Sequence, residues 1–120
     1  MSFSNDRPIY IQLVEQLEIF IISGKVKPGE KLPSVRDFAL SNKVNPNTMQ
    51  KALIELEEKK LIHTPSTSGK YVTNDINVIN SYKKKYLKNK TNEYLNTLRE
   101  LGITKEEVMD YLREEMKWIY

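Results

Sequence analysis

The sequence predicts a mainly α-helical protein with a small β-hairpin, arranged as an N-terminal winged helix-turn-helix followed by a short two-helix C-terminal dimerisation tail. Apolar residues recur at helical spacing in five segments, an Asn-Pro pair at 45–46 marks a helix start, and turn-forming residues 65–69 separate two β-prone runs. In this architecture the second helix of the pair enters the DNA major groove. We therefore expect a winged helix-turn-helix DNA-binding domain at 1–74 and a helical dimerisation tail at 75–120.

Composition and charge indicate which classes of protein this chain can belong to. Of the 120 residues, 39% are hydrophobic and 29% are charged, which is typical of a soluble globular protein. No apolar run approaches the roughly 18 to 20 residues needed to cross a bilayer, and no secretory signal is evident, so we expect a cytoplasmic protein without a membrane partner. The lack of cysteine excludes disulfides and thiolate metal sites, and we expect neither a metal nor a cofactor. The net charge of +3 permits contact with phosphates.

The first helix is expected from Pro8 to about Ile22, with Asp6 or Arg7 at its cap and Pro8 in the first turn, where a missing N–H costs nothing. The Ser-Gly pair at 23–24 supplies its end. A Pro-Gly turn at 28–29 follows, because proline presets φ at one position and glycine accepts a positive φ at the next.

The next two helices form the helix-turn-helix. The second is expected at about 34–42, opened by Ser34, and the third begins with Asn45 as cap and Pro46 at the first helical position. Apolar residues then follow the i, i+3, i+4, i+7 pattern, at Met49, Ala52, Leu53 and Leu56. This leaves polar side chains near the exposed start of the third helix that suit phosphates or base edges: Asn47, Thr48, Gln50 and Lys51.

A hairpin and two more helices complete the chain. Strands are expected at 61–64 and 70–73, joined by residues 65–69 as an exposed wing. A helix of about 20 residues should start near Ile76, with Gly102 as its stop. Thr104 and the glutamate at position 107 match a capping box that opens a last helix.

Charge is divided along the tail. Residues 81–92 carry five lysines and no acid, whereas residues 104–115 hold five acids against Lys105 and Arg113. Two solvated faces are one explanation, and a positive strip near DNA or a complementary contact with a second subunit is the other.

The order and spacing of these motifs resemble the GntR family of bacterial transcriptional regulators, and the short tail resembles its YtrA subgroup. The resemblance covers residues 8–72 and rests on Pro8-Ile9-Tyr10, Gly24, Pro28-Gly29, Leu32-Pro33-Ser34-Val35-Arg36, Val44-Asn45-Pro46-Asn47-Thr48, Ala52, Leu53, Leu56 and Gly69-Lys70-Tyr71-Val72. It implies a homodimer on a palindromic double-stranded DNA operator and suggests a repressor of a transporter operon.

The resemblance also assigns residue roles. Arg36 matches a family arginine, which implies a phosphate or base contact in the major groove, and the match also carries over Asn45, Asn47, Thr48, Gln50 and the wing glycine Gly69. The expected DNA-binding set adds Ser34, Lys51 and Lys70. Our own hypothesis is that Arg36, Lys51 and Lys70 anchor phosphates. Three positions depart from the family pattern: Thr67 replaces a wing glycine, Pro46 replaces an arginine of some subfamilies, and Lys60 replaces a glycine before the wing.

The segment after Val72 is too short for a separate ligand-binding domain, so the tail is expected to pair with another subunit through Tyr82, Tyr86, Tyr94, Leu98, Leu112 and Met116. Alternatively, Tyr82, Tyr86, Tyr94 and Trp118 cover the winged-helix core. Whether a small-molecule effector exists is open; we expect any such ligand at the dimer interface or between the winged helix and the tail.

The sequence also bears on two other function classes, an enzyme and a protein-binding adaptor. Metal or triad catalysis needs several converging ligands or a nucleophile beside a base, and this chain offers one histidine, His63, and no cysteine. Its adjacent glutamate pairs, at 57–58 and 106–107, face different directions on a helix, so we expect no enzyme. The alternative function is a winged-helix adaptor that binds protein without specific DNA recognition.

Overall fold

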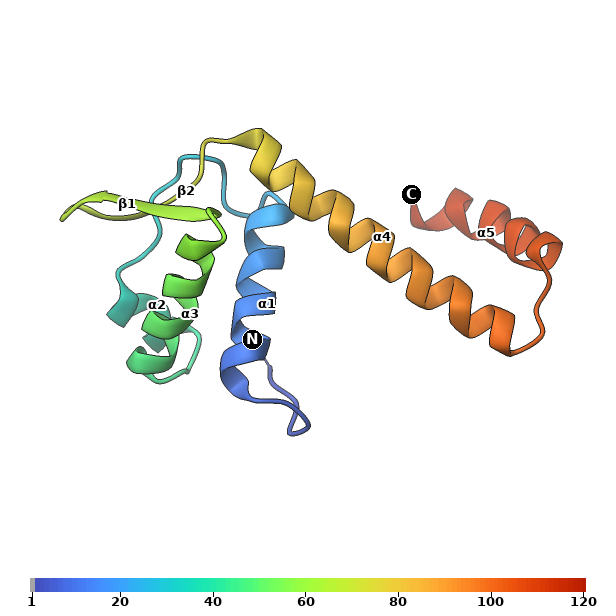
Figure 1. Cartoon of the computed structure of the whole chain (residues 1–120), viewed down its shortest axis with the longest axis horizontal. Coiled ribbons are helices and arrows are strands. Elements are labelled where there is room, and N and C mark those ends of the chain that lie inside the picture. The colour runs from blue at the N-terminus through green and yellow to red at the C-terminus, as the bar shows by residue number, and fades with distance from the viewer. Residues whose placement is uncertain (1) are drawn as a thin grey trace. The chain divides into compact units, whose positions relative to one another are not determined.

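The computed structural model describes residues 2–120 and, within them, contains five helices and one antiparallel hairpin, which confirms the expected fold class (Figure 1). The elements are α1 (Ile9–Ile22), α2 (Val35–Ser41), α3 (Pro46–Glu58), β1 (Ile62–Ser66), β2 (Gly69–Val72), α4 (Ile76–Glu100) and α5 (Lys105–Ile119). The chain divides into two compact units, Met1–Lys83 and Lys84–Tyr120, and the division falls within α4.

The core of the first unit lies between α1, α2, α3 and the hairpin, and α3 packs against both other helices (Figure 1). The apolar residues at helical spacing in α1 and α3 supply half of its buried residues, because they place one stripe of each helix inward. The largest side chains with almost no exposed surface are Leu13, Leu17, Met49, Leu53, Leu56, Leu61, Ile62 and Val72.

The start of α1 differs from expectation. Pro8 occupies the cap position and no side chain caps the helix, so the expectation of Asp6 or Arg7 at the cap was wrong. The buried amide of Gln12 instead ties down the preceding segment: it donates to the carbonyl oxygens of Ser4 and Arg7 at 2.9 and 2.7 Å, and it accepts from the Ser4 amide at 2.7 Å. A long side chain one turn into the helix thus replaces a local cap.

The end of α3 explains how Lys60 is accommodated before the wing. The Leu61 amide donates to the Leu56 carbonyl at 3.0 Å and the Lys60 amide to the Glu57 carbonyl at 2.9 Å, the two bonds of a Schellman motif. That motif needs a left-handed residue after the helix, and Lys60 supplies it with φ of 64°. An L residue with a Cβ is strained there.

Lys60→Gly is therefore expected to raise the free energy of unfolding by up to about 1 kcal/mol, because glycine adopts this φ freely. Urea unfolding of both chains measures the change. Lys60→Ala is the matched control, since it removes the same exposed side chain but keeps the Cβ. Equal stability of the glycine and alanine variants would show that Lys60 is not strained.

An ion pair links α1 to α3. The Lys59 ammonium bonds the carboxylate of Glu18, which is 5% exposed. Burial alone lowers the pKa of Lys59, but the hydrogen bond and charge of Glu18 outweigh it and raise the pKa above its ordinary value of 10.5. A raised pKa means that the pair stabilises the fold fully below pH 10.5 and loses this effect as pH rises through the folded-state pKa.

We therefore expect Lys59→Met to be less stable than the parent chain at pH 7, and the difference to shrink above pH 10.5. Urea unfolding at several pH values measures it. Lys60→Met is the control, because the exposed Lys60 side chain has no ion pair among residues 2–120 and its replacement should show no such pH trend. A constant Lys59→Met difference from pH 7 to 11 would contradict the assignment.

The wing is tighter than expected. Ser66 pairs with Gly69, so the turn contains only residues 67–68, and Pro65 and Ser66 belong to β1 instead of the loop. The register is irregular between His63 and Ser66, and such a bulge accommodates a proline that cannot donate to the ladder. An isolated bridge pairs Lys31 with Tyr71 on β2.

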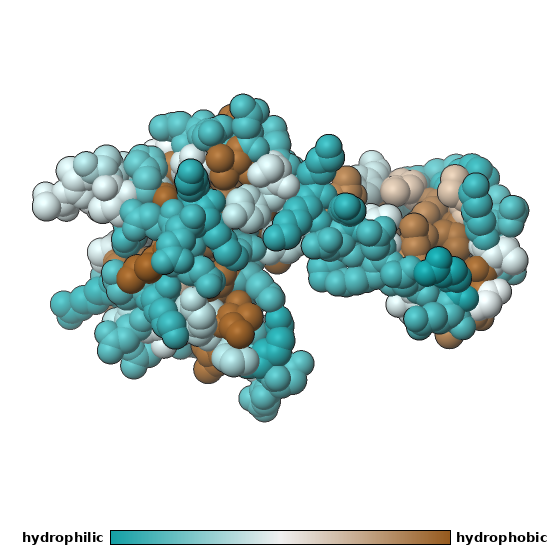
Figure 2. Space-filling view, viewed as in Figure 1, coloured by the Kyte–Doolittle hydropathy of each residue, from teal (hydrophilic) through white to brown (hydrophobic). Residues whose placement is uncertain are grey.

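The second unit holds most of α4 and all of α5. Helix α4 runs for 25 residues, longer than the expected 20 or so, because no glycine or proline interrupts it before Gly102. The Thr104 hydroxyl accepts from the Glu107 amide at 3.2 Å while the Glu107 carboxylate accepts from the Thr104 amide at 2.8 Å, so the expected capping box is confirmed. Figure 2 shows apolar surface gathered on this unit where α5 lies.

Candidate nucleic-acid interface

The start of α3 presents polar groups to solvent while its opposite face is buried. The Asn45 side chain caps the helix by accepting from the Asn47 amide at 2.7 Å. Asn47, Gln50 and Lys51 are exposed and Thr48 is half-buried, whereas Met49 between them is fully buried. Four candidate side chains thus occupy the first two turns of one helix, where backbone N–H groups also favour an anion.

Helix α2 contributes a second polar terminus. The Ser34 hydroxyl caps it by accepting from the Asp37 amide at 3.1 Å. Arg36, in the first turn, is exposed and forms no ion pair or hydrogen bond with any group in residues 2–120. Its guanidinium is therefore available, and the five donors of an arginine match both phosphate and the guanine edge.

Lys51 is held by α1. Its ammonium lies 4.3 Å from the centre of the Tyr10 ring, a cation–π contact. A hydrogen bond to Glu55 raises the pKa of the Tyr10 hydroxyl, and Glu55 is one turn after Lys51 on the same helix. Tyr10 thus contacts two successive turns of α3 and orients one of the expected phosphate anchors.

Lys70 is engaged within the chain. Its ammonium lies 3.7 Å from the Glu57 carboxylate and 3.2 Å from the Thr64 hydroxyl, and only 16% of its side chain is exposed. Its role as a phosphate anchor stays a prediction, since the ammonium would have to leave Glu57. The neighbouring Gly69 has φ of 126°, a backbone conformation that residues with a Cβ rarely adopt, and it lies beside the flexible end of the Lys31 side chain. The wing therefore requires glycine at this point.

All nine expected DNA-binding residues lie in the first unit: at the start of α2, at the start of α3 and at the start of β2. The expected dimerisation residues are in α4 and α5. Of these, Tyr82 packs against the winged-helix core, Leu98 and Leu112 are half-buried, and Tyr94 and Met116 are exposed. In the monomer, Tyr82 therefore covers the winged-helix core, which was the alternative to a role in dimerisation.

Sequence reasoning missed two contributors to this surface. Lys31 lies beside Gly69 and pairs in register with Tyr71, so a cation borders the wing. Tyr10 orients Lys51, as described above. No local sequence pattern predicts the contact of Lys31 with the wing or that of Tyr10 with Lys51, because each contact joins segments far apart in the sequence. Tyr10 was marked only as part of the Pro-Ile-Tyr string at 8–10.

Among residues 2–120, no three histidine, cysteine or carboxylate side chains are grouped as a metal would require, and none of the helices is long and apolar enough to span a bilayer. His63 is exposed on β1, with its ring centre 6.1 Å from that of Tyr71.

Solved structures similar to this chain include two that bear on its architecture. A GntR family transcriptional regulator from Listeria monocytogenes superposes with a TM-score of 0.86 at 36% identity, covering 93% of this chain and 98% of that one. The DNA-binding domain of AraR in complex with operator ORX1 superposes with a TM-score of 0.55 at 25% identity, over 60% of this chain and 93% of that one.

Proteins with similar sequences are also transcriptional regulators of the helix-turn-helix (HTH) type. The HTH-type regulator YhcF of Bacillus subtilis is 32% identical over 93% of both chains. The HTH-type transcriptional repressor YtrA of the same organism is 44% identical over 55% of this chain and about half of its own length, 51%. The family model described as "Bacterial regulatory proteins, gntR family" matches residues 9–72. The chain therefore belongs to the GntR family of bacterial regulatory proteins and is a DNA-binding transcriptional regulator.

Proposed function

We propose that the chain is a homodimeric repressor that binds an inverted-repeat operator, with α3 in the major groove of each half-site. The observation that carries the proposal is the exposed polar start of α3, together with the exposed and unpaired Arg36 of α2, a helix that packs against α3. Likeness to the operator-bound AraR domain supports the docking mode. Helix-turn-helix dimers present two such helices about 34–36 Å apart, one DNA turn.

Each polar side chain has a distinct role in this proposal. Asn47 and Gln50 are exposed amides that pair with adenine in the major groove, and Thr48 beside them offers a hydroxyl. Arg36 and Lys51 contact phosphate or guanine, while the capped starts of α2 and α3, at Ser34 and Asn45, direct backbone N–H groups at the DNA backbone. The wing, at 66–69, adds a contact outside the major groove.

The tail supplies the dimer contact. Many large apolar side chains of α4 and α5 are exposed, and 84% of Trp118 is exposed. Monomeric soluble proteins rarely expose large contiguous apolar patches, so this surface suits an interface with another chain. The excess of lysine in 81–92 and of acid in 104–115 offers complementary charge to a second copy. Tyr94, Leu98, Leu112 and Met116 are the residues we assign to this contact.

Repression follows from occupancy of a promoter. The likeness to the repressor YtrA and the YtrA-like tail support this sign of regulation, and we extend it to an operon for a transporter. A cytoplasmic location follows from the DNA target.

Selection from a random pool of DNA duplexes, at low and moderate salt, tests the proposal. The expected result is one enriched inverted repeat, bound by two chains, with affinity that falls steeply with salt because bound lysines and arginines release counterions. Weak binding to all duplexes without enrichment would contradict operator recognition and favour the protein-binding adaptor. Enrichment of a single half-site bound by one chain would contradict the dimer.

A further inference from the structure

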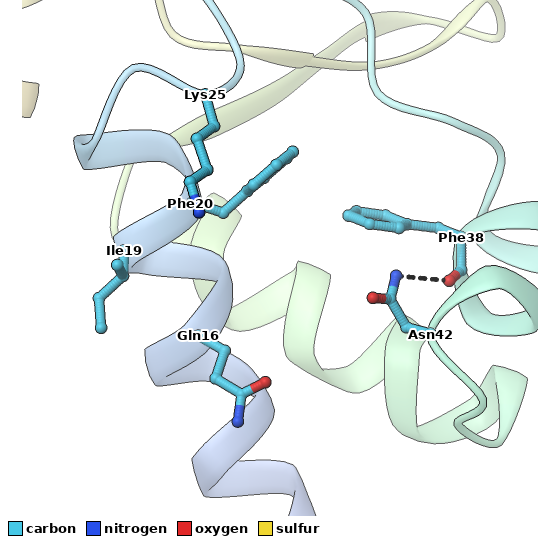
Figure 3. Close-up of a pocket in the computed structure, with 6 residues that line it drawn as sticks. All are labelled: Gln16, Ile19, Phe20, Lys25, Phe38 and Asn42. Carbon is cyan, nitrogen blue, oxygen red and sulfur yellow. Dashed lines mark hydrogen bonds between the residues drawn. The ribbon is translucent and has the colours of Figure 1, made fainter. Parts of the chain in front are cut away.

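A pocket of about 430 Å³ lies between α1 and α2, within the first unit of the chain. It is lined by Gln16, Ile19, Phe20, Lys25, Phe38 and Asn42 (Figure 3). Pockets that hold small molecules span roughly 300–1,000 Å³, with mostly apolar walls and a few polar groups. The expectation that an effector must bind at the dimer interface or near the tail overlooked this location.

Two aromatic rings form the apolar part of the pocket. Phe20 of α1 and Phe38 of α2 extend toward one another across the space, with ring centres 6.4 Å apart and planes tilted by 53° (Figure 3). Aromatic rings prefer such tilted or offset partners over stacked ones. A flat ring entering between α1 and α2 would contact both phenylalanines.

Two amide oxygens form the polar part. The Gln16 amide donates to the Ser2 carbonyl at 2.8 Å, so its nitrogen faces Ser2, and its buried oxygen has no hydrogen-bond partner among residues 2–120. The Asn42 amide donates to the Phe38 carbonyl at 2.9 Å, which leaves its oxygen on the pocket side (Figure 3). Buried acceptors rarely stay unpaired, because losing water without gaining a donor costs free energy. Figure 3 shows this oxygen directed toward the side of the pocket on which Asn42 lies, whereas the nitrogen is directed away from it.

Lys25 supplies the one charged group of the lining, and its ammonium has no ion pair within residues 2–120. A cation disfavours a cationic ligand and favours an anion. The pocket therefore combines an aromatic wall, two acceptors and a cation.

We propose that this pocket binds a small aromatic carboxylate whose ring carries an N–H or O–H donor. The ring would lie against Phe20 and Phe38, the donor would bond Gln16 or Asn42, and the carboxylate would pair with Lys25. Asn42 ends α2 immediately before the turn into α3, so an occupant contacts the helix-turn-helix where a bound molecule can bias DNA binding. This regulatory consequence rests on the proposed function, whereas the binding itself does not.

Three matched probes test the site by chemical-shift changes in the isotope-labelled full chain, without DNA. Indole-3-acetate has all the required groups, 1-methylindole-3-acetate lacks the ring donor, and 3-methylindole lacks the carboxylate. We expect indole-3-acetate to shift the amide signals of Gln16 and Asn42 and to bind about two- to fivefold more tightly than either other probe, the size of effect expected for one hydrogen bond or one exposed ion pair.

Two variants assign the contacts. Gln16→Leu keeps the side-chain bulk without the amide, so it should reduce the preference for indole-3-acetate over its methylated form. Lys25→Met should bring indole-3-acetate and 3-methylindole to similar affinity. Circular dichroism checks that both variants fold.

No shift at the pocket residues with any probe, equal affinity of all three probes, or shifts confined to residues outside the pocket would each overturn the proposal. Because the measurement uses the chain without DNA, any of these results leaves the operator-binding proposal untouched. A loss of DNA recognition in the selection experiment, in turn, leaves the pocket result standing.

Discussion

Leu53→Ala is expected to lower the free energy of unfolding by about 2–5 kcal/mol, the cost of removing a fully buried leucine and leaving a cavity. Leu53 is 1% exposed and lies on the face of α3 that packs against the other helices. Domains of this size are stable by about 5–15 kcal/mol, so a large share of the total is lost. Urea unfolding followed by circular dichroism measures the change.

Ile54→Ala is the matched control, because the next residue is also a large aliphatic on α3 but is 45% exposed. Its loss should be well under half of that for Leu53→Ala, since most of its surface stays in water in both states. A similar loss for both would mean that α3 does not pack with the face assigned here. DNA binding of the Leu53 variant below its unfolding temperature should be retained, because Leu53 does not reach the exposed surface.

Arg36→Ala is expected to weaken binding to the selected operator by about 5- to 150-fold, corresponding to about 1–3 kcal/mol for a good arginine contact. Thermal stability should change little, because the Arg36 side chain has no partner elsewhere in residues 2–120. Fluorescence anisotropy with labelled operator measures the affinity, and thermal unfolding checks the fold.

Arg36→Lys separates the two possible contacts of this arginine. A phosphate contact tolerates lysine, which retains the charge, whereas a two-donor contact with guanine does not. If the contact is to phosphate, Arg36→Ala should also lower the salt slope of binding by about one. Wild-type affinity of Arg36→Ala, at an unchanged salt slope, would remove Arg36 from the interface.

Local signals in the sequence predicted most helix boundaries. Asn45-Pro46, the capping box at 104–107 and the glycine at 102 act through bonds within a few residues, so their effect does not depend on the rest of the fold. The boundaries that were missed depend on more distant partners. Pro65 joins β1 because a bulge admits it, and Gln12 replaces a local cap on α1.

The sequence predicted which residues form the candidate interface, but not which other residues of the chain they contact. The exposed start of α3 follows from amphipathic spacing, which the sequence displays. Three features join segments that are distant in the sequence: the contact of Lys70 with Glu57, the contact of Lys51 with Tyr10, and the pocket between α1 and α2 that includes Gln16. The spacing of residues along one helix or strand carries no information on such contacts. Because both lysines have partners within the chain, phosphate anchoring by Lys51 and Lys70 stays a prediction.

The central claim is that α3 reads base pairs, and a cycle between Gln50 and the operator tests it most directly. Affinities of the parent chain and of Gln50→Ala are measured for the selected operator and for every symmetric single base-pair substitution in its half-sites. The account predicts that Gln50→Ala removes the preference at one position in each half-site, worth about 1–3 kcal/mol in the parent, and keeps it elsewhere. Equal weakening on every sequence, with all preferences retained, would contradict base recognition by Gln50.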